Sequence, residues 1–434
     1  MIRKKISTVS EQVSPDVSLK LVVRKPSVLL LQGPIGPFFK ELQRELESQG
    51  SFTKRVIFNI ADRFYSGSKN VEFFNLKPLL WESWLNNYID AYNFDVIVLF
   101  GCEREQHIVA RKVANERDIK VLSLEEGYIR PGFITAELGG NNRFSPMNHF
   151  FESYNSDAPV LSERRPIGGG GVANMAWYAF IYFTLRAAGR TFNSKEMRHK
   201  NRPVIKEAFF WIRNFIRKFT RSNRNNDAVN RIIENHAHDY FFVPLQVTDD
   251  MQLLNGGRGW SNLSLIESTL SSFAKNASSE KVIVFKVHPL ERGHFDYEKI
   301  VSSLARKHGC EDRAFVVDDG DIGILIREST AVMTINSSCG FLAIRNGKPL
   351  AVLGEAIYRN EAIAHCVENE DDIDGFWKSH KPARGDISSN FINQIRAKAL
   401  LSGDFYRPEG RKVACKLIAN KVSTLSYGRL KQLN

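Results

Sequence analysis

Two adjacent carboxylates, Glu125 and Glu126, follow the short apolar run 121–124 and precede a glycine. The run is typical of a buried parallel strand, and Gly127 lets the backbone turn sharply at its end. Acidic side chains at the carboxyl end of a strand lie where open α/β folds bind ligands. A carboxylate there can take a proton from a hydroxyl or act as a nucleophile. A structural role fits the spacing equally well, with Glu125 capping the next turn or pairing with Arg130.

Lys286 and His288 mark the end of another apolar run, 281–286, in the second half of the chain. Pro289 restricts the backbone directly after the histidine. A cation and an imidazole at a strand end can neutralise a phosphate and assist its departure. A lone histidine is more often structural than catalytic, but a His-Pro pair at a strand end favours a phosphate site.

Two serines complete this predicted phosphate site. Ser337 and Ser338 follow Asn336, which ends an apolar run and precedes a predicted helix. Free N–H groups at the start of a helix, together with two hydroxyls, bind phosphate readily. Gln246, at the end of another predicted strand, is assigned to the same site. The predicted donor-binding residues are therefore Gln246, Lys286, His288, Asn336, Ser337 and Ser338.

A tight glycine-containing loop follows the first apolar run, 27–32, and leads into a predicted helix over 38–49. Strand, glycine loop and helix are how a Rossmann-like half begins. The loop lacks the G-x-G-x-x-G spacing of a dinucleotide site, so its predicted use is close approach of a ligand to the backbone. An ordinary turn explains it equally well. We assign Gly33, Gly36 and Arg130 to the acceptor side of the site.

Strand and helix patterns alternate through both halves of the chain. The predicted strands are 27–32, 55–59, 94–100, 120–124, 240–246, 281–286, 314–318, 331–336 and 349–353. Segment 131–160 is predicted to be a long loop, and 391 to about 422 a helical tail that crosses back onto the first domain. We therefore predict an α/β fold of the GT-B-like class, with two facing Rossmann-like domains and a helical basic-aromatic insertion between them.

Changes in composition set the predicted boundaries. Four consecutive glycines at 168–171 break regular structure and indicate a hinge or linker. The predicted segments are a polar leader (1–26), an N-terminal Rossmann-like acceptor and catalytic domain (27–165), a basic aromatic helical segment (166–235), a C-terminal Rossmann-like nucleotide-sugar domain (236–390) and a C-terminal helical tail (391–434). The carboxylates would then face the nucleotide-sugar domain across an interdomain cleft, where ligands commonly bind.

The basic aromatic segment combines two features. Residues 172–185 are apolar and aromatic, but too few to span a bilayer. From Arg186 to Arg224 there are twelve Lys or Arg and two Glu, interleaved with aromatic residues. This pattern predicts a helical segment lying on an anionic leaflet. A helical hairpin packed on the body with a solvated basic face is the alternative, and no nucleic-acid motif accompanies the basic residues.

The net charge of +12 predicts an anionic partner. Five scattered cysteines without CxxC spacing indicate neither a zinc site nor a disulfide framework. We find no signal-peptide pattern and no run of 18 apolar residues, so we expect a cytoplasmic location without a transmembrane helix. The phosphate site has its own cation, so we expect no required metal.

Taken together, five motifs resemble the capsule polysaccharide synthesis family of the KpsS/LipB type. They are Leu31-Gln-Gly-Pro, Glu125-Glu-Gly-Tyr-Ile-Arg-Pro, Val243-Pro-Leu-Gln, Lys286-Val-His-Pro and Asn336-Ser-Ser-Cys-Gly. The resemblance implies a retaining β-Kdo transferase that uses CMP-Kdo as donor substrate and needs no cofactor. It implies a lysophosphatidylglycerol acceptor at the cytoplasmic face of the inner membrane, where the capsule's Kdo linker is started.

Carried over by position, the resemblance makes Glu126 the reacting carboxylate. It makes Lys286 and His288 phosphate contacts, and Ser337 and Ser338 the nucleotide-binding pair. Two alternatives stay open from the residues alone: transfer of another capsular sugar, and a non-catalytic protein that binds nascent capsule during export or assembly. A capsule biosynthesis or export complex is accordingly a further expected partner, alongside the sugar nucleotide, the phospholipid and an anionic membrane surface.

Overall fold

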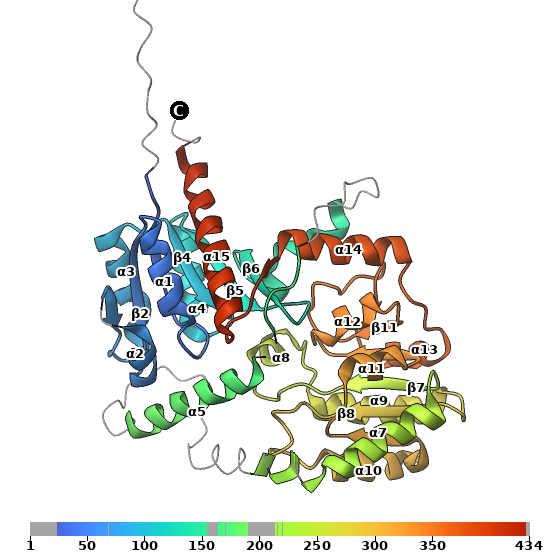
Figure 1. Cartoon of the computed structure of the whole chain (residues 1–434). Helices are drawn as coiled ribbons and strands as arrows, with labels where there is room; N and C mark the ends of the chain where they lie inside the picture. Colours follow the sequence, from blue (N-terminus) through green and yellow to red (C-terminus); the bar gives the residue numbers. More distant parts are fainter. Residues whose placement is uncertain are drawn as a thin grey trace, which may run out of the picture.

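The computed structural model describes residues 24–67, 69–153, 164–169, 171–189, 213–214, 216–218 and 220–430. These residues form two α/β units, each built on its own sheet, and the two units lie side by side (Figure 1). The predicted α/β class with two facing, mainly parallel sheets in a GT-B-like arrangement is therefore confirmed. Most of the predicted leader and most of the stretch 186–224 lie outside the described residues.

The first sheet has seven strands in the order β13-β6-β5-β4-β1-β2-β3. All pairings are parallel except β5 with β6 and β6 with β13. The strands are β1 (Ser27–Leu30), β2 (Phe52–Ile57), β3 (Val71–Phe73), β4 (Val96–Phe100), β5 (Lys120–Glu126), β6 (Phe133–Leu138) and β13 (Leu400–Ser402).

Helices cover both faces of this sheet, which explains why its central strands are apolar on both sides. Val28 and Leu30 of β1 belong to the core shared with α1 and α15, whereas Leu29 belongs to the core shared with α3 and α4. The helices of this unit are α1 (Phe38–Ser48), α2 (Ile60–Ser66), η1 (Pro78–Leu80), α3 (Trp81–Tyr92), α4 (Glu105–Glu116), η2 (Asn142–Phe144), η3 (Pro146–His149), η4 (Phe151–Ser153), α5 (Val172–Gly189) and α15 (Pro408–Leu430).

The second sheet is parallel throughout, in the order β12-β11-β10-β7-β8-β9. Its strands are β7 (Tyr240–Pro244), β8 (Val282–Lys286), β9 (Ala314–Val317), β10 (Ala331–Thr334), β11 (Leu350–Val352) and β12 (His365–Cys366). The accompanying helices are α7 (Ser222–His236), α8 (Met251–Gly256), α9 (Asn262–Asn276), α10 (Tyr297–His308), η5 (Glu311–Arg313), α11 (Ile322–Arg327), α12 (Cys339–Arg345), α13 (Asp371–Lys378) and α14 (Gly385–Lys398).

The prediction of a loop over 131–160 is wrong for its first part. Residues 133–138 form β6, which pairs antiparallel with β5, and short 3-10 helices follow; residues 154–160 lie outside the described residues. Because β6 extends the pairing of β5, Glu125 and Glu126 lie within the strand and not in the loop after it. Local sequence patterns did not predict β6, because one of its two neighbours, β13, comes from the distant tail.

The tail is not one helix. It contains the end of α14, then β13, then α15. The strand pairs with β6, with Leu401 opposite Ile134, and α15 packs on α1. The predicted crossing back onto the first unit is therefore confirmed, but a strand interrupts the predicted helix.

The described parts of segment 166–235 belong to different units. Helix α5 packs against α2 of the first unit, with Tyr182 in a small core together with Ala61 and Tyr65. Helix α7 packs against β9 of the second unit, where Ile232 joins the main core.

Gly127→Ala should lower the free energy of unfolding by about 1–3 kcal/mol. A Cβ at this position would lie 2.4 Å from the carbonyl oxygen of Phe133, which is main chain and cannot rotate away. The matched control is Gly375→Ala in α13, where a Cβ meets nothing within 4 Å. That variant should be unchanged or gain up to about 1 kcal/mol, because alanine favours helix. Urea denaturation measures both; equal losses would contradict the steric explanation.

Candidate functional site

The two carboxylates lie at the end of β5 but have different surroundings. Glu125 lies beside Gly101 and Arg104: a Cβ at residue 101 would lie 3.5 Å from Glu125 Oε2 and 3.4 Å from Arg104 Nε. The φ of Gly101 is +75°, so glycine is needed there. Arg104 Nη1 also donates to Gln32 Oε1 at 3.1 Å, which fixes the guanidinium beside the carboxylate. Glu126, the next residue along the strand, contacts the tail of the chain instead.

Burial, the negative charge of Asp250 and that of Glu126 together raise the pKa of Glu125 to about 7, and the Arg104 guanidinium opposes the rise. Asp250 lies at the start of α8 in the second unit. A carboxyl group with a pKa near 7 exchanges a proton readily at neutral pH, which suits general acid–base catalysis. The effect of Asp250 also shows that Glu125 lies where the two units meet.

Tyr406 is the partner of Glu126. It lies between β13 and α15, and its main-chain N–H donates to Asp404 Oδ1 at 2.7 Å, which holds the turn. Burial raises the pKa of the Tyr406 hydroxyl well above its usual value, and the charge of Glu126 and a hydrogen bond to that carboxylate raise it further. A neutral phenol is therefore kept beside Glu126.

The structural alternative for Glu125 is only partly correct. Arg130 does not pair with Glu125 in the described structure; its Nε donates to the carbonyl of Gly127 at 3.1 Å. Glu125 Oε1 instead accepts from the main-chain N–H of Glu126 at 3.4 Å. The positive charge of Arg130 lowers the pKa values of two groups on opposite sides of the site, Tyr406 beside the carboxylates and His288 beside Lys286.

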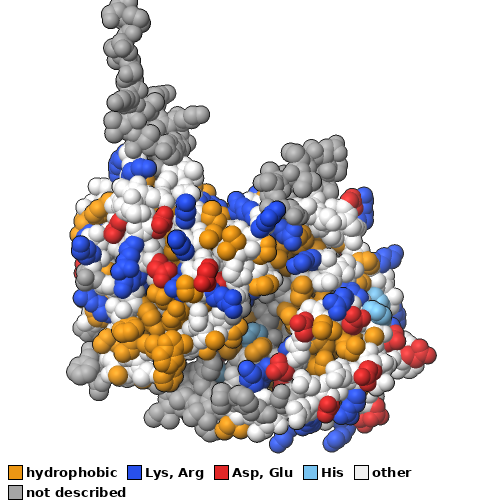
Figure 2. Space-filling view, viewed as in Figure 1, with side chains coloured by type: hydrophobic (Ala, Val, Ile, Leu, Met, Phe, Trp, Pro, Cys, Tyr) orange, Lys and Arg blue, Asp and Glu red, His pale blue; other side chains and the backbone are white. Residues whose placement is uncertain are grey.

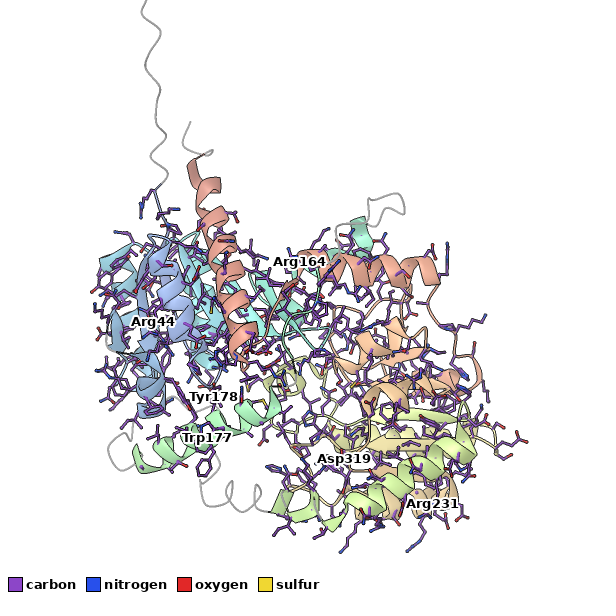
Figure 3. The ribbon with its side chains drawn as sticks, viewed as in Figure 1. Arg44, Arg164, Trp177, Tyr178, Arg231 and Asp319 are labelled. Atoms are coloured by element: carbon purple, nitrogen blue, oxygen red, sulfur yellow. The ribbon has the colours of Figure 1, made fainter. Side chains whose placement is uncertain are left out.

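Lys286 and His288 form the cationic side, at the end of β8. Lys286 is only 7% exposed and has no hydrogen-bond or ion-pair partner among the described residues. Burial lowers its pKa, and the nearby Asp319, labelled in Figure 3, opposes this. Arg292, also buried, donates to the carbonyl of Asp318 at 2.6 Å and pairs with Asp319 at 3.2 Å. A buried cation without a partner is costly unless a ligand supplies the anion.

Burial and the positive charges of Lys286, Arg130 and Arg292 together lower the pKa of His288 to about 4. The imidazole is therefore neutral at pH 7. Its Nδ1 faces the N–H of Leu290 at 3.2 Å and accepts from it, so the proton is assigned to Nε2. The Nε2–H group is a neutral donor, able to bind a phosphate oxygen beside the cations.

Gln246 and Asn336 bond to each other. Gln246 Nε2 donates to Asn336 Oδ1 at 2.8 Å, and the Asn336 N–H donates to Gln246 Oε1 at 3.1 Å. Asn336 Nδ2 donates in turn to the carbonyl of Gln252 at 2.8 Å. These amides thus hold together the loops after β7 and β10. Their predicted contact with a donor stays a prediction.

The serine pair lies at the start of α12. Ser337 Oγ accepts from the Cys339 N–H at 3.2 Å, and Tyr358 donates to the carbonyl of Ser337 at 2.5 Å. Ser338 is exposed and its side chain makes no capping hydrogen bond. The Ser338 hydroxyl is the more open of the two toward a ligand.

The glycines after β1 have a packing role. A Cβ at Gly33 would lie 2.5 Å from the ring of Phe39 in α1, and a Cβ at Gly36 would lie 2.8 Å from the ring of Tyr178 in α5. The φ of Gly36 is +114°, which also favours glycine. Glycine is therefore required at both positions because aromatic rings of the chain pack directly against the backbone there. The predicted contact with an acceptor is not needed to explain these glycines.

Specific contacts hold the two units together around the site. Glu103, which is buried, accepts from Arg143 at 2.6 and 2.8 Å and from Asn255 of α8 at 2.8 Å. Tyr128, just after the double glutamate, stacks on Phe341 of α12 with ring centroids 5.2 Å apart. A charge-assisted cluster and an aromatic contact thus fix the carboxylates relative to the second unit.

In the part of the chain that the structure describes, we find no group of three or more His, Cys, Asp or Glu side chains able to hold a metal ion. In the same part, none of the helices is long and apolar enough to cross a bilayer. A cavity of about 440 Å³ lies between α7, α10 and β9. Its lining includes none of the predicted site residues, so the cavity is separate from the candidate site.

The chain belongs to the family described as capsule polysaccharide biosynthesis protein, whose model matches residues 95–406. This match shows that the protein takes part in capsule polysaccharide biosynthesis or modification. The chain is 29% identical to the capsule polysaccharide export protein KpsS of Escherichia coli, over 90% of this chain and 99% of that protein. It is 26% identical to the capsule polysaccharide modification protein LipB of Neisseria meningitidis, over 88% of this chain and 91% of that protein.

Among solved structures, the chain is similar to the β-Kdo 2,4 transferase of Thermosulfurimonas dismutans KpsC. The TM-score is 0.43 at 13% identity, covering 92% of this chain and 98% of that one. A UDP complex of Staphylococcus aureus MnaA gives a TM-score of 0.34 at 10% identity, covering 92% and 96%.

Two residues of the site, Arg104 and Tyr406, were not predicted from the sequence. Arg104 follows the end of β4, so the strand-end rule that selected Glu125 could also have selected it. No local signal could have selected Tyr406, because its place beside Glu126 depends on the tail crossing over. Both are brought to the carboxylates by tertiary structure alone.

Glu125→Gln should make the chain more stable than the wild type at alkaline pH. The folded pKa of Glu125, about 7, lies above the value of about 4.3 for an unfolded glutamate. The folded state therefore binds more protons between these values, and stability falls as the pH rises through this window. The variant should not show this loss of stability as the pH rises. Urea titrations between about pH 5 and about pH 8 measure it, with Glu105→Gln on the exposed start of α4 as control; equal pH dependence of all three proteins would contradict the burial of Glu125.

Proposed function

We propose that this protein is a glycosyltransferase that moves Kdo from CMP-Kdo to a lysophosphatidylglycerol or phosphatidylglycerol acceptor and so starts the capsule linker. The observation that carries the proposal is the division of the site. Glu125 and Glu126 lie on the first unit, whereas Lys286, His288 and Arg292 lie on the second. An acid sugar joined to a phosphate needs both halves: cations for the phosphate and carboxylates for the sugar carbon and the acceptor.

The cationic side fits the phosphate of CMP. Lys286 is a buried cation without a partner among the described residues, and a phosphate would supply the missing anion. The neutral imidazole of His288 can donate a hydrogen bond from Nε2 to a phosphate oxygen. The side chain of Ser338 is exposed, so its hydroxyl is accessible to a ligand. Because these groups stabilise negative charge, they favour departure of CMP.

The resemblance to retaining β-Kdo transferases supports a double displacement. Glu126 attacks the anomeric carbon of Kdo, the carbon–oxygen bond to CMP breaks, and CMP leaves with the bonding electrons. The acceptor hydroxyl then attacks the same carbon, its proton passes to Glu125, and the Glu126 carboxylate leaves. Two inversions retain the configuration. The pKa of Glu125, near 7, suits the transfer of this proton.

The acceptor is supported by the motif resemblance and by the chain's charge. A net charge of +12 fits an anionic phospholipid at the cytoplasmic face of the inner membrane, where we propose that the protein acts as a peripheral protein. Transfer of another capsular sugar would use the same site. A second candidate is a non-catalytic role in export, which the name of the Escherichia coli relative favours.

Incubation with CMP-Kdo and lysophosphatidylglycerol should increase the mass of the lipid by one or more Kdo units. Glu126→Gln should lower the rate by roughly 10³-fold or more, because the nucleophile is lost. Glu125→Gln should lower it roughly 10²-fold and remove the rise in rate through about pH 7 that a general base gives. Mass spectrometry of the lipid follows all three proteins.

The other outcomes separate the alternatives. CMP release without a change in the lipid would mean that the donor is correct and the acceptor wrong. Neither product, together with binding of capsule polysaccharide, would favour the export role. Full activity of Glu126→Gln would remove that residue from the reaction and leave Glu125 as the candidate nucleophile.

Lys286→Met should weaken CMP binding at least about tenfold, because one charge-assisted contact to the phosphate is lost. The same change should leave the free energy of unfolding equal or higher, since it removes a buried cation that has no partner among the described residues. The matched control is Lys281→Met at the other end of β8, where the lysine pairs with Asp239 at 2.7 Å. Isothermal titration with CMP compares them; weakened binding in both would indicate a general effect of net charge.

A further inference from the structure

Helix α5 and the neighbouring α2 expose a continuous set of large apolar side chains. We call this set the aromatic face; its residues and exposed fractions are Trp177 (60%), Phe180 (63%), Phe183 (39%), Phe64 (59%) and Ile60 (44%). The three residues of α5 are spaced three apart, so they form one stripe along the helix. Hydrophobic side chains gather over α2 and α5 at the lower left of the molecule (Figure 2). Exposed patches of this kind mark interaction sites.

The other side of α5 is firmly attached. The Tyr182 hydroxyl accepts from Asn59 Nδ2 at 2.8 Å and donates to Asp62 Oδ1 at 3.3 Å. The Tyr178 hydroxyl accepts from Arg411 Nη1 at 3.1 Å. Tyr178 lies on the side of α5 that faces the first unit, and Trp177 lies on the opposite side (Figure 3). The helix is therefore held in a defined orientation with its aromatic stripe outward.

The charged residue of α5 and the exposed charged residue of α2 are both basic. Helix α5 contains Arg186 and no Asp or Glu. In α2, Arg63 is exposed next to Phe64, whereas the one carboxylate of this helix, Asp62, is buried against Tyr182. Aromatic side chains flanked by cations are the composition of helices that lie at the headgroup level of anionic bilayers. A protein partner with an apolar groove would not require this charge.

The aromatic face begins at the candidate active site. Asn174, in the first turn of α5, donates to the carbonyl of Tyr406 at 3.2 Å, and Tyr406 contacts Glu126. Gly36, in the loop after β1, packs directly on Tyr178. A surface on which α5 lies would therefore bring its headgroups to the carboxylate side of the site.

We propose that the aromatic face docks the protein on the surface of an anionic phospholipid bilayer. The helix lies in the plane of the headgroups, with Trp177, Phe180 and Phe64 inserted and the flanking cations bound to lipid phosphates. Docking stands on the exposed residues and their charge. Only its consequence, delivery of a lipid acceptor to Glu126, rests on the proposed function.

The test is sedimentation of the full chain with vesicles of phosphatidylcholine, with and without phosphatidylglycerol. The wild type should bind the vesicles that contain phosphatidylglycerol and bind those of pure phosphatidylcholine weakly. The double variant Trp177→Ser/Phe180→Ser should bind the anionic vesicles about tenfold or more weakly. The matched control is Phe52→Ser. This phenylalanine is 45% exposed, but it lies at the start of β2, whereas the candidate site lies at the carboxyl ends of the parallel strands.

Unchanged binding by the double variant would overturn the proposal, as would equal binding to neutral and anionic vesicles. Light scattering without lipid tests the alternative that a second copy of the chain binds this face. A dimer that the double variant dissociates would show that the aromatic face joins two copies of the chain. Circular dichroism confirms that the variants fold. Should the double variant unfold, Phe64→Ser on α2 repeats the measurement from the other helix.

A second readout separates docking from catalysis. With lysophosphatidylglycerol dissolved as monomers, the double variant should turn over as the wild type does; with the acceptor embedded in vesicles, it should lose about tenfold. Equal losses on both acceptors would contradict a docking role. If no Kdo transfer occurs with any protein, the proposed function fails, while the vesicle binding still decides the docking proposal.

Discussion

The crossing of the C-terminal tail is the constraint on which the site depends. Strand β13 completes the first sheet by pairing with β6, and β6 in turn holds the end of β5. The turn that joins β5 to β6 passes through Gly127, where no side chain fits. As a result Glu125 and Glu126 are held in a paired strand, and the chain that leaves β13 brings Tyr406 to Glu126. The carboxylate end of the first unit is thus built partly from residues 400–406.

Separation of charge gives the site its chemistry. Burial raises the pKa of Glu125 and lowers those of Lys286 and His288, because a buried position disfavours the charged form of each group. Buried charges are costly without partners, and the described contacts satisfy Glu103 and Arg292 but not Lys286. We interpret this contrast as a difference in role: Glu103 and Arg292 stabilise the structure, whereas Lys286 is available to bind a ligand.

Helix α5 lies between the candidate site and the exposed aromatic face. One side of it supports the glycine loop and the tail, and the other exposes aromatic residues. A transferase whose acceptor is an amphiphile has to work at an interface, because the acyl chains stay in the bilayer. A helix fixed beside the carboxylates and flanked by cations would place the active site at the level of the headgroups.

The sequence by itself determined much of the fold and of the candidate site. Continuous apolar runs such as the one ending at Leu31 predict buried parallel strands, and polar residues at strand ends, including Glu125 and His288, predict the edge where ligands bind. Local patterns could not predict β6 and β13, whose pairing joins residues far apart in the chain, nor the contact of Tyr406 with Glu126. Nor could they show that Gln246 and Asn336 bond to each other. Periodicity reports which face of an element is buried, but which distant partner covers it is decided only when the chain packs.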